Sequence, residues 1–481
     1  MILSSLRLGD RLVDVRVDGG LITEIGPALG SDPDRRDFGG RWVSPGLWDH
    51  HVHFTQWALT SQRIDLSLAA SAKEAADIVA GARGSTSTSE PSTGIIVGAN
   101  FRDAVWPDAP SVDLLDAATH GIPTVLVSAD LHAVWLNTAA LQRYGHAGHP
   151  TGLLKEDDAF AIHRGLDAVS DETVDSWARA AADAAARRGV VGIVDLEMAW
   201  NLGVWQRRIA SGHDALRVEF TVYTHDLDRA ISEGLRTGDA HGELLTMGRY
   251  KVLTDGSLNT RTAYTWEPYA DGTHGVLTVP PEALLANLRR AVEAGILPDV
   301  HAIGDHANTV ALDAFQQLAS LPSYRGGRIE HAQLLVESDY PRFAELGVEV
   351  SVQPEHAMDD REASERFWAG RTDRLYAFRD LLDAGATLLF GSDAPVSPLD
   401  PWLGIAAAVS RERDGREPWH PEQRITRAEA LAASTRTTVA VGQPADLVIT
   451  DLDPLAASGD ELRGMPVAAT LLGGRFTFNV D

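Results

Sequence analysis

The sequence predicts an α/β protein whose main part is a (β/α)₈ TIM-like barrel. Eight apolar runs with strand character recur along the chain, and helical patterns separate several of them. Several runs also end in a potential metal ligand, and the carboxyl ends of barrel strands are where active sites form. The eight runs are Trp42–His53, Val190–Asp195, Leu216–Tyr223, Arg249–Thr254, Leu297–His301, Gly327–His331, Val348–Gln353 and Thr387–Ser392.

Two helices of the barrel have clear boundary signals. The segment Pro281–Ala294 starts with a proline, carries a leucine-rich face and is followed by Gly295. Thr426 and Glu429 have the spacing of a capping box, in which each side chain bonds the other residue's backbone N–H. We therefore expect helices to begin at these two places.

The two chain ends and one long interval interrupt the barrel pattern. Short β segments at both ends predict a small composite β-sandwich. The interval between the first two barrel strands far exceeds the roughly 30 residues of a βαβ unit, so we expect an inserted α+β subdomain over the barrel mouth. The expected parts are residues 1–48 (sandwich), 49–63 (first barrel strand and metal motif), 64–170 (insertion), 171–430 (rest of the barrel) and 431–481 (C-terminal helix end and rest of the sandwich).

Composition restricts the function classes. The formal net charge of −26 opposes binding to nucleic acid or to an anionic membrane, and it favours a neutral or cationic small-molecule substrate. The absence of cysteine excludes disulfides, zinc-thiolate sites and a thiol nucleophile. We find no signal-type N-terminus and no apolar run near the ~18 residues of a membrane span. We expect a cytoplasmic protein, and the acidic surface is compatible with a homodimer.

A histidine pair lies at the end of the first barrel strand. His51 and His53 project to the same side of an extended strand, about 7 Å apart at their Cα atoms, so both rings can reach one cation. A pair of this kind can also be two hydrogen-bonded core histidines. Four later strands end in further potential ligands, which favours the metal interpretation: Lys251, His301, His331 and Asp393.

The motifs around these residues resemble those of a known family. PGLWDHHVH, WLNTAAL, KVLTDGSLNTRTA, HAIGDHA, RIEHAQ, SVQPEH, GSDAPV and GQPADLVI occur in the order found in the amidohydrolase superfamily, in the family 3 branch similar to N-substituted formamide deformylase. The resemblance implies one or two divalent metal ions. Zn is favoured, and Mn, Fe or Co also suit the ligands. The implied ligands are His51, His53, Lys251, His301, His331 and Asp393.

Two of these residues have a more specific expected role. The resemblance implies that Lys251 is N6-carboxylated and bridges two ions; the alternative is an ammonium group paired with a carboxylate such as Asp255. Asp393 is expected to ligate metal and to move a proton, whereas on its own it could be a helix N-cap. His306 competes with His301 as a ligand, but its position beyond the strand end favours His301.

Five further motif residues are expected near the site. They could bind substrate, hold the ligands in place or only stabilise loops. They are His132, Asp255, Arg261, Gln353 and His356.

These observations lead to one predicted function and two alternatives. We expect a metal-dependent amidohydrolase that cleaves a non-peptide C–N bond by metal-activated hydroxide, with Asp393 as the proton shuttle. The same chemistry could open lactones or cleave phosphotriesters. A catalytically silent scaffold of the same fold is a third interpretation, but a scaffold has no need of a full ligand set.

Overall fold

A computed structural model of the chain describes residues 1–82, 94–103, 106–128, 133–155, 157–166 and 169–480. The chain divides into two compact units, Met1–Phe54 with Ala182–Asp481, and Thr55–Ala181. Among the described residues, no helix combines the length and the apolar character needed to cross a bilayer.

The first unit contains a barrel of eight parallel strands. In sheet order from the first strand they are β6 (Leu47–Val52), β12 (Val190–Asp195), β13 (Arg217–Tyr223), β14 (Leu245–Leu253), β15 (Pro298–Ala302), β16 (Gly327–His331), β17 (Val348–Val352) and β18 (Leu388–Phe390). The first and last strands also approach each other: the backbone N–H of Asp393, after β18, donates to the carbonyl of His51 in β6 at 2.7 Å. The structure thus contains the nearly closed eight-stranded parallel sheet expected of a TIM-like barrel.

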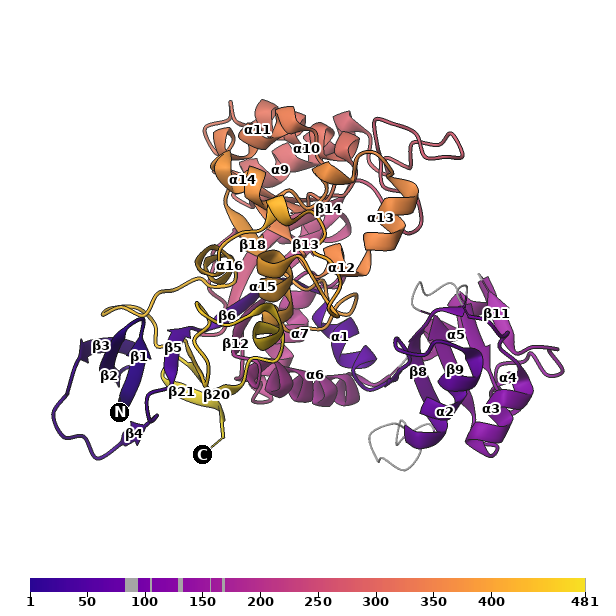
Figure 1. Cartoon of the computed structure of the whole chain (residues 1–481). Helices are drawn as coiled ribbons and strands as arrows, with labels where there is room; N and C mark the ends of the chain where they lie inside the picture. Colours follow the sequence, from indigo (N-terminus) through magenta and orange to yellow (C-terminus); the bar gives the residue numbers. More distant parts are fainter. Residues whose placement is uncertain (83–93, 104–105, 129–132, 156, 167–168, 481) are drawn as a thin grey trace. The chain divides into compact units, whose positions relative to one another are not determined.

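Helices of the first unit pack against these strands. α9 packs against β14 and β15, α10 against β15 and β16, and α11 against β17. Figure 1 labels these three helices. α16 begins with the predicted capping box of Thr426 and Glu429. The helices are α7 (Asn201–Ala210), α8 (Leu227–Ser232), α9 (Pro281–Glu293), α10 (Asp305–Leu318), α11 (Tyr340–Glu345), α12 (His356–Asp359), α13 (Arg361–Phe367), α14 (Phe378–Asp383), α15 (Pro401–Ser410), α16 (Arg427–Ala433) and α17 (Gly459–Arg463).

The segment expected to be one long first strand forms two strands in different sheets. β5 (Trp42–Pro45) pairs with β19 (Leu447–Thr450), whereas β6 pairs with β12. The chain passes from one sheet to the other at Gly46, where a Cβ atom would lie 2.4 Å from a methyl group of Val191. Only glycine fits this approach, and it marks the boundary between the barrel and the terminal sheet.

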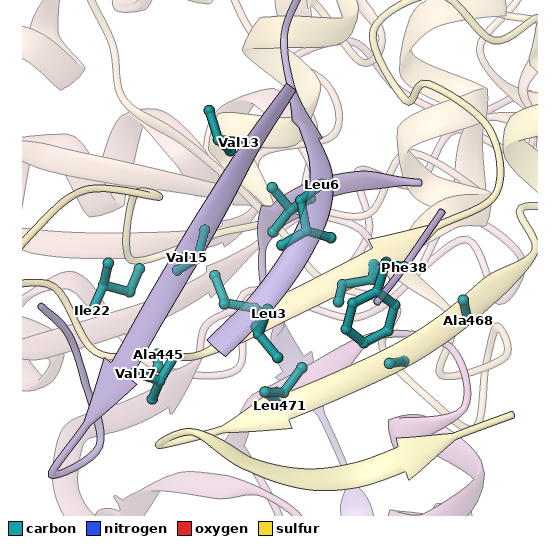
Figure 2. Close-up of a cluster of buried hydrophobic side chains, with 14 residues drawn as sticks. Leu3, Leu6, Val13, Val15, Val17, Ile22, Phe38, Ala445, Ala468 and Leu471 are labelled. Carbon is teal, nitrogen blue, oxygen red and sulfur yellow. The ribbon is translucent and has the colours of Figure 1, made fainter. Parts of the chain in front are cut away.

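Both chain ends contribute to that terminal sheet. Hydrogen bonds link its strands, because β5 pairs with strands from both ends: with β19, and at one residue pair, Arg7 with Trp42, with β1. Figure 2 shows the shared apolar core, in which Leu3 and Val15 from the N-terminus gather with Leu471 from the C-terminus. The other strands are β1 (Ile2–Leu8), β2 (Arg11–Asp18), β3 (Leu21–Gly26), β4 (Arg35–Asp37), β20 (Val467–Leu472) and β21 (Arg475–Asn479).

The second unit has its own sheet and two apolar cores. Side chains alternate along its strands, so that Leu126 and Trp135 belong to one core and Val125 and Val134 to the other. Its elements are β7 (Ile64–Asp65), α2 (Ala72–Ala82), β8 (Ile96–Phe101), α3 (Val112–Thr119), β9 (Thr124–Ser128), β10 (Ala133–Leu136), α4 (Thr138–Arg143), β11 (Leu153–Lys155) and α5 (Asp157–Leu166), with α1 (Phe54–Thr60) and α6 (Asp171–Ala186) at its borders.

Candidate metal centre

Three of the predicted ligand residues come together where the barrel closes. Ligand atoms of His51, His331 and Asp393 all lie within 4.8 Å of one another, and all three residues are buried. The Oδ1 atom of Asp393 lies 3.2 Å from Nε2 of His51 and 3.3 Å from Nε2 of His53. The histidine pair of the first strand and the aspartate after the last strand therefore face the same point.

The ring of His301 lies beside this group. Its centroid is 4.4 Å from that of His331, which in turn is 4.9 Å from that of His51. Lys251 pairs in register with Asp299 on the neighbouring strand, two residues before His301. Burial, and then the positive charge of Lys251, lower the pKa of His301 to about 3. This ring is therefore neutral and able to bind a metal at ordinary pH.

The backbone is bent at two of these positions. His331 has φ = 72° and Asp393 has φ = 56°, both in the left-handed region that non-glycine residues seldom adopt. In a regular strand His331 would face away from its neighbour Glu330. The bend instead brings the ring of His331 beside those of His51 and His301.

The acidic and basic groups of the centre shift one another's pKa in the metal-free protein. Burial disfavours a charged His51 ring, but the carboxylates of Glu330 and Asp393 outweigh burial and raise the pKa of His51 to about 9. Burial opposes ionisation of Asp393 as well, yet His51 and hydrogen bonds from His51 and His53 hold the pKa of Asp393 well below its usual value. Burial also lowers the pKa of His331 strongly.

The donor set fits a divalent ion. Four buried nitrogen atoms of the predicted ligands make no hydrogen bond to any residue that the structure describes: Nδ1 of His53, Nε2 of His301, Nδ1 of His331 and Nζ of Lys251. Buried polar atoms are normally paired. Imidazole nitrogens together with a carboxylate are ligands that a zinc-type ion prefers.

Lys251 has a different neighbour from the one considered in the sequence. Its Nζ atom lies 3.8 Å from Oδ1 of Asp299, and both side chains are buried. Asp255 is instead held by backbone groups, because its carboxylate accepts from the N–H groups of Tyr264, Ile303 and Gly304 at 2.9–3.0 Å. The carboxylate beside the Lys251 amine is thus Asp299, whereas Asp255 is bound by backbone N–H groups.

Asp255 nevertheless lies close to the centre. Its Oδ1 atom is 3.5 Å from Nε2 of His301. Burial raises the pKa of Asp255 to about 7, although the three backbone donors favour the charged form. Asp255 thus fixes the loop after β14 to the loop after β15, next to a candidate ligand.

The other expected site residues lie at varying distances from the centre. Gln353 Nε2 is 3.2 Å from Nδ1 of His51, and the His356 ring stacks at 6.2 Å on that of His331. Arg261 is exposed and donates to Asp271 at 2.9 Å. His132 lies outside the described residues.

The alternative ligand His306 does not join the centre. Its ring stacks between those of Tyr264 and Trp266, with centroid separations of 4.3 Å and 3.4 Å. This placement agrees with the prediction that His301, at the strand end, is the ligand rather than His306.

Two charged residues of the barrel interior were not among the expected site residues. Asp299 and Glu330 are fully buried and precede His301 and His331 on their strands. Each pairs in register with a residue of the neighbouring strand that is a predicted ligand: Asp299 with Lys251, and Glu330 with His301. The signal was present in the sequence as charged residues at every second position, in Asp299-x-His301 and Arg328-x-Glu330, within otherwise apolar strands.

Imidazoles and a carboxylate at the carboxyl edge of such a barrel are typical of metal-dependent hydrolases. The chain belongs to the amidohydrolase family, because the family model of that description matches residues 36–478. The resemblance seen in the motifs is thereby confirmed, and the chain is a hydrolase of this family with a candidate divalent-metal site.

Three similar proteins cover nearly the whole chain. N-substituted formamide deformylase from Arthrobacter pascens is 25% identical over 96% of this chain and 94% of its own length. Protein LONG AFTER FAR-RED 3 from Arabidopsis thaliana is 28% identical over 91% of this chain and 82% of its own. The crystal structure of a metal-dependent hydrolase from Pyrococcus horikoshii OT3 matches with a TM-score of 0.75 and 26% identity, over 95% of this chain and 99% of that one.

Proposed function

We propose that the protein hydrolyses the C–N bond of a small, non-peptide amide at a centre of one or two divalent ions. The observation that carries the proposal is the convergence of His51, His331 and Asp393 ligand atoms within 4.8 Å at the carboxyl edge of the barrel. A relative that is 25% identical is named for the removal of a formyl group from an N-substituted formamide, which is a reaction of this class.

The proposed ligands are His51, His53, His301, His331 and Asp393, with Lys251 beside them. A bound ion of the zinc type would supply Lewis acidity, which lowers the pKa of water toward ~7 and polarises a carbonyl group. The neutral rings of His301 and His331 are ready to donate lone pairs without first losing a proton.

Asp393 is the residue that we assign to proton transfer. Its carboxylate stays ionised in the metal-free protein and touches both rings of the first-strand pair. It accepts a proton from the attacking water and delivers it to the nitrogen that leaves. The C–O bond forms, the C–N bond breaks, and the products are a carboxylic acid and an amine.

Lys251 is the residue that decides between one and two ions. We propose that its amine is N6-carboxylated, since a carboxylate there could bridge two cations. The buried Nζ atom supports this assignment, because it makes no hydrogen bond to the described residues and lies 3.8 Å from Oδ1 of Asp299, beyond hydrogen-bond distance.

Metal removal tests the proposal. The purified chain is stripped with a chelator, reloaded with Zn²⁺, Mn²⁺, Co²⁺ or Fe²⁺, and assayed on N-substituted formamides and cyclic amides. Hydrolysis should vanish with the metal and return with it. Hydrolysis that survives complete removal of metal would contradict the proposal.

Substrate class and ligand identity are tested separately. A panel of amides, lactones and phosphotriesters should show the highest kcat/KM for an amide; a lactone or phosphotriester preference would move the function to that class. A matched pair of variants tests the ligands: His301→Ala should lose bound metal, whereas His306→Ala, five residues along and stacked on Tyr264 and Trp266, should keep it.

A further inference from the structure

A buried carboxylate lies against the candidate ligand His51. Oε2 of Glu330 is 2.6 Å from Nδ1 of His51, and the exposed fractions of the two side chains are 0% and 2%. The contact joins the first strand of the barrel to the sixth, β6 to β16. At this separation the two atoms share a short, charge-assisted hydrogen bond.

The geometry assigns the two nitrogens of His51 to different tasks. A carboxylate can only accept a hydrogen bond, so Nδ1 of His51 must carry a proton and donate it to Glu330. The lone pair of the neutral ring then lies on Nε2, which is the nitrogen that faces Asp393 at 3.2 Å. With the opposite tautomer, Nε2 would present a hydrogen to the centre and could not bind metal.

The other oxygen of Glu330 faces a cation. Nη1 of Arg328 lies 3.9 Å from Oε1, the oxygen that does not face His51. The carboxylate group comes from strand β16, where Glu330 pairs in register with His301 of β15.

We propose that Glu330 positions His51 for metal binding by fixing its Nδ1–H tautomer and the orientation of its ring. This inference rests on the proposed function, because it presumes that His51 is a metal ligand. Glu330 is a positioning residue, since it acts through His51. Partners of this kind on a ligating histidine typically change metal affinity by 10–100-fold when they are removed.

The test compares metal affinity in two isosteric variants. Glu330→Gln removes the charge and allows its amide to donate to Nδ1, which favours the wrong tautomer. Glu349→Gln is the control: Glu349 also contacts Arg328, at 3.2 Å, and Arg249, at 2.7 Å, but the structure gives it no histidine partner among the described residues. Zn²⁺ affinity is measured by competition with a fluorescent chelator, and circular dichroism of the metal-free chains checks that they are folded.

Glu330→Gln should bind Zn²⁺ roughly 10–100-fold more weakly than the native chain, and Glu349→Gln should bind it with unchanged affinity. Equal affinity of Glu330→Gln and the native chain would overturn the inference. So would equal weakening by both variants, which would indicate a general effect of the barrel charges. If the native chain itself binds no ion, the proposed function fails instead.

A double-mutant cycle tests whether Glu330 acts through His51 or by another route. Glu330 and His51 are changed singly and together, with His51→Ala as the second substitution, and Co²⁺ affinity is measured for each. When His51 is absent, Glu330→Gln should cause no further loss. Additive losses would overturn the inference, since Glu330 would then act by another route.

Discussion

Oδ1 of Asp393 lies 3.2 Å from Nε2 of His51, so a side chain of the first barrel strand meets a side chain that follows the last strand, at the point where the barrel closes. The same two residues are joined by a backbone hydrogen bond of 2.7 Å. Closure of the sheet and assembly of the candidate centre are thus one structural event. The position of Asp393 also depends on the segment after β18, where its φ is 56°.

Substitution of Asp393 should reduce turnover much more than it reduces metal binding. Asp393→Asn retains an oxygen that can bind the ion but cannot accept and return a proton at neutral pH. The variant should keep most of its metal, measured by elemental analysis, and lose a factor of roughly 10²–10⁴ in kcat on the best amide substrate. A variant with near-native kcat would remove Asp393 from the proton-transfer role.

Metal binding should release a proton from His51. The pKa of this ring is about 9 in the metal-free protein, so the ring is charged at pH 7.5, and a ligating imidazole must be neutral. Affinity should therefore fall as the pH drops below about 9. His301, with a pKa of about 3, is already neutral and adds no proton.

Calorimetry checks this proton release. Zn²⁺ titrations at pH 7.5 in two buffers of different ionisation enthalpy, both free of CO₂, should show about one proton released per ion from His51. A heat of binding that is the same in both buffers would show that His51 is not displaced from its protonated form.

Lys251 should acquire a carboxyl group from CO₂ when metal is present. Its Nζ atom is buried and makes no hydrogen bond to the described residues. Reconstitution with metal and ¹³C-bicarbonate should give a carbamate signal by ¹³C NMR, and Lys251→Ala should lack it. The same spectrum for both chains would leave Lys251 as an ammonium group beside Asp299.

The side chain of Asp255 should contribute strongly to the free energy of unfolding. Asp255→Ala leaves three backbone N–H groups, of Tyr264, Ile303 and Gly304, without their acceptor. The expected loss is about 3 kcal/mol in the free energy of unfolding, measured by denaturant titration of the metal-free chain. Asp271→Ala, an exposed aspartate in the same loop, is the control and should change little.

The barrel could be predicted because its strands are short, apolar and separated by clear helical signals. Val190–Asp195 and Gly327–His331 are strands with the expected boundaries. The long first strand was wrong, because apolar residues continue through Gly46 without a break in pattern. Its division depends on contact with Val191, which is distant in the sequence.

The candidate centre could be predicted only in part. Strand-end positions pointed to His51, His331 and Asp393, which the structure brings together, but they gave no reason to prefer Asp299 to Asp255 as the neighbour of Lys251. That choice depends on register, which pairs Lys251 with Asp299 across two strands. The role of Glu330 was hidden because regular alternation places it and His331 on opposite faces, and the bend at His331 removes that separation.

The central claim is that these side chains hold a divalent ion at the carboxyl edge of the barrel. Anomalous diffraction at the zinc edge, from crystals of the chain loaded with Zn²⁺, tests it most directly. The account predicts an anomalous peak within bonding distance of Nε2 of His51 and the carboxylate of Asp393. Density for zinc only at other places, or none at all in a folded and loaded chain, would contradict it.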